Sequence, residues 1–106
     1  MPLTIQTEEN RMTAALSGEL DHHHTARLRE EIDAAARRDR PAELVLDFSR
    51  VEFMDSSGIG LVLGRYRLMQ ELEGCMTLRA MPPHIKRVMK IAGIGSLPIK
   101  EEEVKA

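Results

Sequence analysis

Aromatic residues are scarce in this 106-residue chain, which has one Tyr, two Phe and no Trp. Proteins that bind single-stranded nucleic acid stack the bases on aromatic rings, so this scarcity argues against that class. Cys75 is the single cysteine, which excludes an internal disulfide and a multi-cysteine zinc site. The formal net charge is −2, so no overall charge draws the chain toward nucleic acid or an anionic membrane.

Long hydrophobic runs are also missing. No window approaches the roughly 18 apolar residues that a membrane span requires, and the first residues lack the basic region and apolar run of a signal peptide. The chain does contain 42% hydrophobic and 30% charged residues, which is typical of a globular protein with a well-solvated surface. We therefore expect a single cytoplasmic domain over residues 1–106, with an aliphatic core.

Hydrophobic periodicity predicts alternating strands and helices. Strands are expected at Leu3–Thr7, Met12–Leu16, Leu44–Phe48, Met76–Met81 and, as a last short strand, Leu97–Ile99, and helices at residues 21–39, Ser57–Glu73 and Pro83–Ala92. The segment Val51–Met54 is interpreted as a short connection, and the acidic end from residue 100 as a solvated or frayed tail. Strand–helix–strand units form parallel pairs through right-handed crossovers, so we expect an α/β fold of successive βα units whose first strand is an antiparallel edge.

Three consecutive histidines follow Asp21, which raises the question of a metal site. Consecutive helical residues lie about 100° apart, so they cannot all face one ion. Asp21 and His24 alone have the spacing that metal-binding helices use, and two ligands make a weak site. The other interpretations are that Asp21 caps a helix beginning there, or that it contacts a partner. We expect no metal and no cofactor.

Two adjacent serines, Ser56 and Ser57, follow Asp55 between a predicted strand and a predicted helix. A hydrolase nucleophile is expected in a Gly-x-Ser-x-Gly turn with a positioned base. Met54 and Asp55 stand where that pattern requires Gly-x, and no spacing selects a histidine as the base, so we do not expect an enzyme. A second interpretation is that Asp55, Ser56 or Ser57 caps the helix, because all three types accept hydrogen bonds from a first turn.

One cap does not need three capping residues followed by Gly58 and Gly60. The glycines leave the first helical turn with little side chain, so its backbone is open to approach. Gly60 and Gly64 are four residues apart and lie on one face of the helix, which lets another surface come close. Such a place suits a partner protein, and its serines are accessible to a kinase. The chain has no Gly-x-x-x-x-Gly-Lys-Ser/Thr loop for nucleotide phosphates.

The order and spacing of three motifs resemble the bacterial anti-sigma factor antagonists of the STAS class, and within it the stage II sporulation protein AA group. These motifs are GELDHH at residues 18–23, FMDSSGIG at residues 53–60 and LGRY at residues 63–66. Residues 86–88 and 92–94 also look like the third helix of that family and the turn after it. The resemblance covers nearly the whole chain. It implies a mixed sheet of four to five strands, with the helices packed mainly on one side.

The resemblance also implies a mechanism of partner switching. In this family the unmodified protein binds an anti-sigma factor, which is also a serine kinase, and so frees a sigma factor. The kinase then phosphorylates the first serine of the Asp-Ser-Ser-Gly motif, which ends the binding, and a serine phosphatase restores it. That serine corresponds to Ser56, and the aspartate of GELD corresponds to Asp21, which is implied to contact the kinase. The partner-binding residues expected on this basis are Asp21, Asp55, Ser56, Ser57, Gly58, Ile59 and Gly60.

Two features depart from the family pattern. His24 adds a third histidine after GELD, and little sequence follows the acidic run, where the family usually has a further helix. The alternative interpretation is a STAS regulatory module of another stress or partner-switching phosphosignalling pathway. Under either interpretation we expect a cytoplasmic regulatory protein that is a monomer when free, is not an enzyme, and binds neither nucleic acid nor membrane.

Overall fold

The computed structural model describes residues 3–104, which form one five-stranded sheet with three α-helices and one 3-10 helix. The elements follow one another as β1 (Leu3–Glu8), β2 (Arg11–Leu20), α1 (Thr25–Asp39), β3 (Glu43–Met54), α2 (Ser56–Glu71), β4 (Cys75–Arg79), α3 (Pro83–Ile91), η1 (Ile94–Ser96) and β5 (Lys100–Glu102). The predicted alternation of strands and helices is confirmed.

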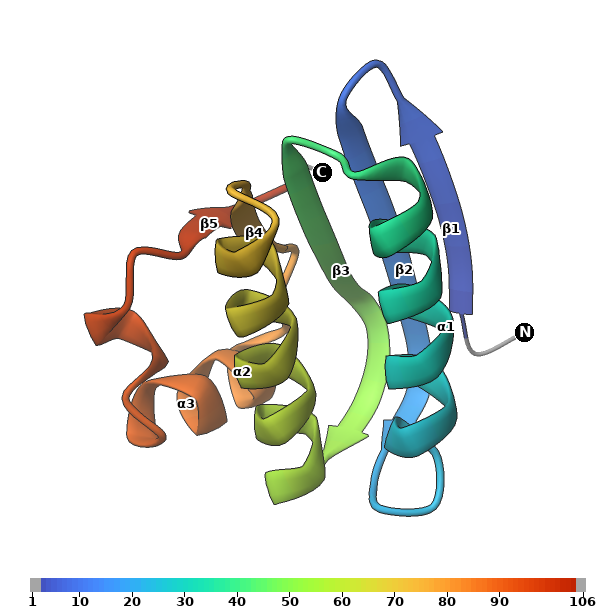
Figure 1. Cartoon of the computed structure of the whole chain (residues 1–106). Coiled ribbons are helices and arrows are strands. Elements are labelled where there is room, and N and C mark those ends of the chain that lie inside the picture. Colours follow the sequence, from blue (N-terminus) through green and yellow to red (C-terminus); the bar gives the residue numbers. More distant parts are fainter. Residues whose placement is uncertain (1–2, 105–106) are drawn as a thin grey trace.

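The sheet has the strand order β1-β2-β3-β4-β5. The edge pair β1 and β2 is antiparallel, and the other pairs are parallel. Each parallel pair is joined by a helical connection, and the fixed hand of such crossovers places successive helices on the same side of the sheet. Figure 1 shows α1 and α2 next to each other in front of the sheet, and the buried Ile85 and Met89 of α3 join the same core. The expected mixed sheet with helices mainly on one side is therefore confirmed.

Alternation along the strands decides which face of the sheet is buried, because successive side chains point to opposite faces. In β2, Met12, Ala14 and Leu16 are buried in the core. The residues between them point to the opposite face of the sheet, away from the helices. On that face, charged side chains of neighbouring strands form ion pairs. Arg11 of β2, for example, lies 3.0 Å from the carboxylate of Glu43 in β3. One face of the sheet thus carries the core and the other carries polar contacts.

An ion pair fastens α1 to α2. Arg65 of α2 is only 4% exposed, and its Nε lies 2.7 Å from Oδ1 of Asp33 in α1. Its Nη2 also donates a hydrogen bond to Oδ2 of Asp33 at 3.3 Å. Burial lowers the pKa of Arg65 and Asp33 raises it, and the net pKa is below the ordinary arginine value. An arginine stays protonated in proteins, so the pair is ionic at neutral pH.

Both central strands are longer than predicted. β2 continues to Leu20 and β3 to Met54, so the expected strand end at Leu16 and the expected connection at Val51–Met54 are wrong. Leu20 and Met54 are register partners at the end of this extension. Register shifts of the kind that β-bulges produce interrupt the pairing before that point. They remove the two-residue alternation by which the strands would have been recognised.

The last strand also differs from its prediction. It is β5, Lys100–Glu102, and the segment Leu97–Ile99 lies outside it, after η1. β5 pairs in parallel with β4, so the expected fraying from residue 100 is wrong for these residues. Oε2 of Glu102 lies 2.6 Å from Nη2 of Arg11 on β2. The acidic run by itself does not indicate that an arginine so distant in the sequence pairs with it. Residues 105 and 106, the end of the expected tail, lie outside the described residues.

Candidate functional site

The two loops that carry the sequence motifs meet at one end of the sheet. Leu20 and Met54 are partners in adjacent parallel strands, so the chain leaves β2 and β3 at the same edge. The backbone N–H of Asp55 donates a hydrogen bond to the carbonyl of Leu20 at 3.2 Å, which ties the second loop to the first. Asp21 and Asp55 therefore each stand directly after the carboxyl end of a strand, where open α/β sheets present their functional residues.

Asp55 is the N-cap of α2. Its backbone is extended, and its Oδ1 accepts a hydrogen bond from the backbone N–H of Ser57 at 2.8 Å. This selects Asp55 from the three capping residues that the sequence left open. Ser56 is the first helical residue and is exposed, whereas Ser57 is half-buried. The two serines are therefore not equivalent: Ser56 presents its side chain to solvent.

Asp21 does not cap α1, and the helix begins four residues later than predicted, at Thr25. The N-cap position is His24, which makes no side-chain capping bond. Oδ1 of Asp21 instead accepts hydrogen bonds from the backbone N–H groups of His23 at 3.0 Å and His24 at 3.2 Å, and lies 2.7 Å from Nδ1 of His24. Its carboxylate thus holds a tight turn between β2 and α1. Capping residues stabilise such turns as readily as helix starts, which explains the misprediction.

The pKa of Asp21 is set by opposing effects. Desolvation raises it, but the hydrogen bonds from the His24 ring and the His23 backbone lower it, and the net pKa is below the ordinary aspartate value. Asp21 is therefore ionised at neutral pH and contributes negative charge beside the second loop. His22 connects the two loops, because its Nδ1 lies 4.0 Å from Oδ2 of Asp55.

The structure also bears on the metal and nucleophile interpretations. Within residues 3–104, no three histidine, cysteine, aspartate or glutamate side chains gather closely enough to hold a metal ion. In the same part of the chain, neither Ser56 nor Ser57 has a histidine nitrogen at hydrogen-bond distance from its hydroxyl. Across these residues no helix has both the length and the apolar character needed to cross a membrane.

The glycines of the motif have different roles. Gly58 is buried, and a Cβ there would collide with Cγ and Sδ of Met54, so packing requires a glycine. Gly60 and Gly64 have no such requirement, because a Cβ at either position would meet nothing within 4 Å. Ile59, which lies between Gly58 and Gly60, is partly buried against the core. The open backbone expected in the first turn at Gly58 and Gly60 is therefore found at Gly60, and the expectation is wrong for the buried Gly58.

The sequence did not show that the aromatic residue at the start of the FMDSSGIG motif is exposed. Phe53 lies near the end of β3 and is 50% exposed. Beside it, the ring Nε2 of His84 in α3 lies 2.9 Å from the carbonyl oxygen of Glu52, which ties α3 to the same strand end. The signal that could have found Phe53 is its position one residue before the buried Met54, on the opposite face of a strand.

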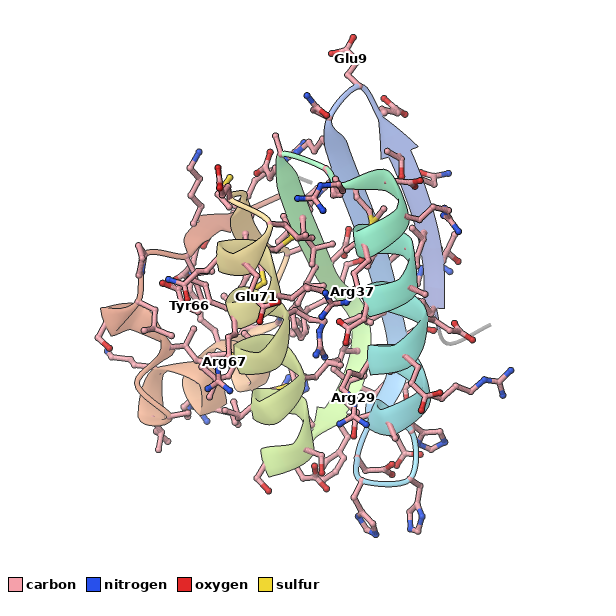
Figure 2. The ribbon with its side chains drawn as sticks, viewed as in Figure 1. Glu9, Arg29, Arg37, Tyr66, Arg67 and Glu71 are labelled. Atoms are coloured by element: carbon pink, nitrogen blue, oxygen red, sulfur yellow. The ribbon has the colours of Figure 1, made fainter. Side chains whose placement is uncertain are left out.

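A cleft opens between the two helices beside the serines. This α1–α2 cleft has a volume of about 260 Å³ and is lined by Thr25, Arg29, Ser57, Gly60 and Leu61. Figure 2 shows the Arg29 side chain in the space between α1 and α2. The lining combines one turn of each helix, and only folding brings these segments together. No local pattern in the sequence indicates this cleft.

The fold and the Asp-Ser-Ser-Gly turn at the start of α2 define a STAS domain. The sequence model of the family described as "Mlab, STAS domain" matches residues 3–99, and this chain belongs to that family. It is 38% identical over 109 aligned residues to the anti-sigma F factor antagonist of Paenibacillus polymyxa, with 100% of this chain and 93% of the relative covered.

Two solved structures of SpoIIAA have the same fold as this chain. The anti-sigma factor antagonist SpoIIAA in its unphosphorylated form superposes with a TM-score of 0.83 at 30% identity, covering 97% of this chain and 88% of that one. The Bacillus cell fate determinant SpoIIAA in the phosphorylated form superposes with a TM-score of 0.77 at 30% identity, covering 97% and 91%. The resemblance noted in the sequence is confirmed.

Proposed function

We propose that this chain is an anti-sigma factor antagonist that works by partner switching. Its unphosphorylated form binds an anti-sigma factor that is also a serine kinase, and a sigma factor is released. Phosphorylation of Ser56 ends the binding, and a serine phosphatase restores it. The observation that carries the proposal is the exposed Ser56 at the start of α2, where the loops after β2 and β3 meet. The identity to an anti-sigma F factor antagonist over the whole chain supports it.

Accessibility favours Ser56 over Ser57 as the phosphate acceptor. A kinase must bring the serine hydroxyl to its catalytic base and to the γ-phosphate of ATP. Ser56 is exposed, whereas Ser57 is half-buried, lines the α1–α2 cleft and gives its backbone N–H to the Asp55 cap. A phosphorylated form has also been solved for SpoIIAA, whose fold this chain shares.

The partner-binding surface includes both loops. Asp55 and Ser57 flank Ser56, Asp21 follows the neighbouring strand at the same end of the sheet, and Gly60 provides the open backbone. Gly58 and Ile59 contribute by shaping the first turn of α2, because both pack inward. The exposed Phe53 adds an aromatic side chain, and aromatic residues are enriched at protein–protein interfaces.

Charge and bulk explain how one phosphate could act as a switch. Phosphorylation adds roughly −1.5 to −2 charge units at neutral pH. A helix N-terminus tolerates an anion, so the fold of α2 survives the modification. At an interface, however, the phosphate follows the carboxylate of Asp55 directly, shares the end of the sheet with Asp21, and must be desolvated. A loss of about 2–4 kcal/mol would weaken binding about 30- to 1,000-fold, which is enough to exchange partners.

The same proposal covers the cellular setting. We place the protein in the cytoplasm as a regulatory phosphoprotein without enzymatic activity of its own, acting in transcription control during sporulation. The relation to an anti-sigma F factor antagonist and to SpoIIAA supports this setting. A stress pathway would be indicated instead if the native partner recovered from the source cell were a different anti-sigma kinase.

The test uses the purified anti-sigma F factor of Paenibacillus polymyxa. We expect the unmodified protein to bind it in the presence of ADP, and incubation with ATP to add about 80 Da (one phosphate) and release the partner. Ser56→Ala should bind without incorporating phosphate, and Ser57→Ala is the matched control that should still be modified. Full modification of Ser56→Ala would assign the phosphate to another residue. Ser56→Asp should weaken binding while its circular dichroism spectrum stays native.

A further inference from the structure

The α1–α2 cleft contains a cation without a counter-ion. Arg29 is exposed, and within residues 3–104 no carboxylate lies at ion-pair distance from its guanidinium. The carboxylate of Asp33, one turn further along α1, is already paired with Arg65. The positive charge of Arg29 is close enough to Arg65 to lower the pKa of Arg65 further. The cleft therefore has an excess of one positive charge, and it lies directly beside the acidic turns of Asp21 and Asp55.

The size of the cleft limits what can occupy it. Its volume of about 260 Å³ is below the range of about 300–1,000 Å³ typical of small-molecule sites. One lining position, Gly60, has no side chain, and a Cβ there would point into free space. A glycine inside a helix is less favourable than alanine, and no intramolecular contact requires a glycine at this position. This combination suits a protein side chain that enters between the helices.

The charge of Arg29 becomes important for binding when a partner docks over Ser56 and covers the cleft. Ser57, the residue after Ser56, lines the cleft together with Arg29, so a protein that docks over Ser56 and extends over Ser57 also reaches Arg29. Burying an unpaired guanidinium is strongly unfavourable, whereas a carboxylate can accept two parallel hydrogen bonds from it. A partner that covers this cleft must therefore supply an anion.

We infer that the α1–α2 cleft receives a carboxylate side chain of the anti-sigma factor, and that Arg29 is the residue that binds this carboxylate. This inference rests on the proposed function, because it names a contact made during the same docking event. The surface then has two adjoining parts of opposite charge: the acidic turns at Asp21 and Asp55, and the cationic cleft. A partner must match both parts, and this sets specificity as well as affinity.

Isothermal titration calorimetry against the anti-sigma F factor of Paenibacillus polymyxa, with ADP present, tests this contact. Arg29→Glu should weaken binding about 30-fold or more, because it places two carboxylates together. Arg29→Lys should weaken it less, about 3- to 10-fold, because the charge is kept and the bidentate geometry is lost. Gly60→Ala should also weaken binding by narrowing the cleft, while its thermal midpoint is not lowered.

The matched control is Arg67→Glu. Arg67 is another exposed arginine, on α2, and Figure 2 shows it on the side of that helix away from Arg29. The substitution Arg67→Glu makes the same charge change as Arg29→Glu, but outside the cleft. It should therefore alter the affinity for the anti-sigma factor less than about threefold at 0.15 M salt, where distant charges are screened. Equal losses for Arg29→Glu and Arg67→Glu would show a general charge effect and overturn the inference.

The remaining outcomes separate this inference from the proposed function. If the wild-type protein does not bind the anti-sigma factor, the proposed function and this contact both fail. If the wild type binds and Arg29→Glu binds equally well, the contact alone fails. If Arg29→Glu leaves binding unchanged but shifts the ³¹P resonance of phosphorylated Ser56, the cleft takes the phosphate of this chain. The partner-carboxylate assignment is then overturned.

Discussion

The carboxylate of Asp55 accepts a hydrogen bond from the backbone N–H of Ser57 at 2.8 Å, and the exposed Ser56 stands between them. The cap fixes the first turn of α2 without using the Ser56 hydroxyl. Asp55→Ala should lower the free energy of unfolding by about 1 kcal/mol, and Asp55→Asn by a few tenths, because asparagine also caps. Urea unfolding followed by circular dichroism measures both. Equal losses would mean that the charge of Asp55, and not its capping bond, is what stabilises the turn.

Two glycines that are two residues apart in α2, Gly58 and Gly60, provide a second test. At Gly58 an added Cβ would collide with the side chain of Met54, so Gly58→Ala should lower the free energy of unfolding by about 1–3 kcal/mol. At Gly60 an added Cβ meets nothing, so Gly60→Ala should raise it by up to about 1 kcal/mol through helix propensity. Thermal denaturation of the two variants side by side compares them. A destabilised Gly60→Ala would reveal an intramolecular role for that glycine.

The sequence predicted the order of the elements because strands and helices have different hydrophobic periods. It also placed both motif loops after strands, although β2 and β3 run further than expected, to Leu20 and Met54. The capping roles were harder to assign, because aspartate and serine make the same local hydrogen bonds in turns and at helix starts. Hence Asp55 could not be separated from its serine neighbours, and Asp21 was placed on a helix that begins at Thr25.

Features that depend on distant partners were beyond the reach of the sequence. β5 is short and charged, and Glu102 gains its partners from β2 and β4, at 2.6 Å from Arg11 and 3.7 Å from Arg79. An acidic run without known cations has the pattern of a solvated tail. The α1–α2 cleft is similar, since Arg29 and Ser57 come close only once both helices pack on the sheet. The local sequence pattern cannot show which charged side chains find an ion-pair partner in the folded protein and which do not.

The buried ion pair between α1 and α2 should contribute more to stability than an exposed pair between the same helices. Asp33→Ala leaves Arg65 buried without a counter-ion, and we expect a loss of about 3 kcal/mol. The comparison is Arg37→Ala, which removes an exposed pair with Glu71 at 3.8 Å, seen between α1 and α2 in Figure 2. Its loss should stay below about 1 kcal/mol. Similar losses in urea unfolding would mean that burial adds nothing to the inner pair.

The turn after β2 should be sensitive to acid in a predictable direction. Desolvation raises the pKa of Asp21, the hydrogen bonds from His24 and His23 lower it more, and the net pKa lies below the ordinary value of 3.8. A depressed carboxyl pKa stabilises the folded turn above the unfolded pKa, and this contribution disappears as the pH falls through the folded pKa. The amide signals of His23 and His24 should therefore titrate with a midpoint below 3.8 in ¹H–¹⁵N spectra, because their N–H groups donate to this carboxylate. Asp21→Asn should abolish that step while the rest of the spectrum stays folded. A midpoint at or above the ordinary value would mean that desolvation outweighs the hydrogen bonds, and the turn would then be held by its backbone alone.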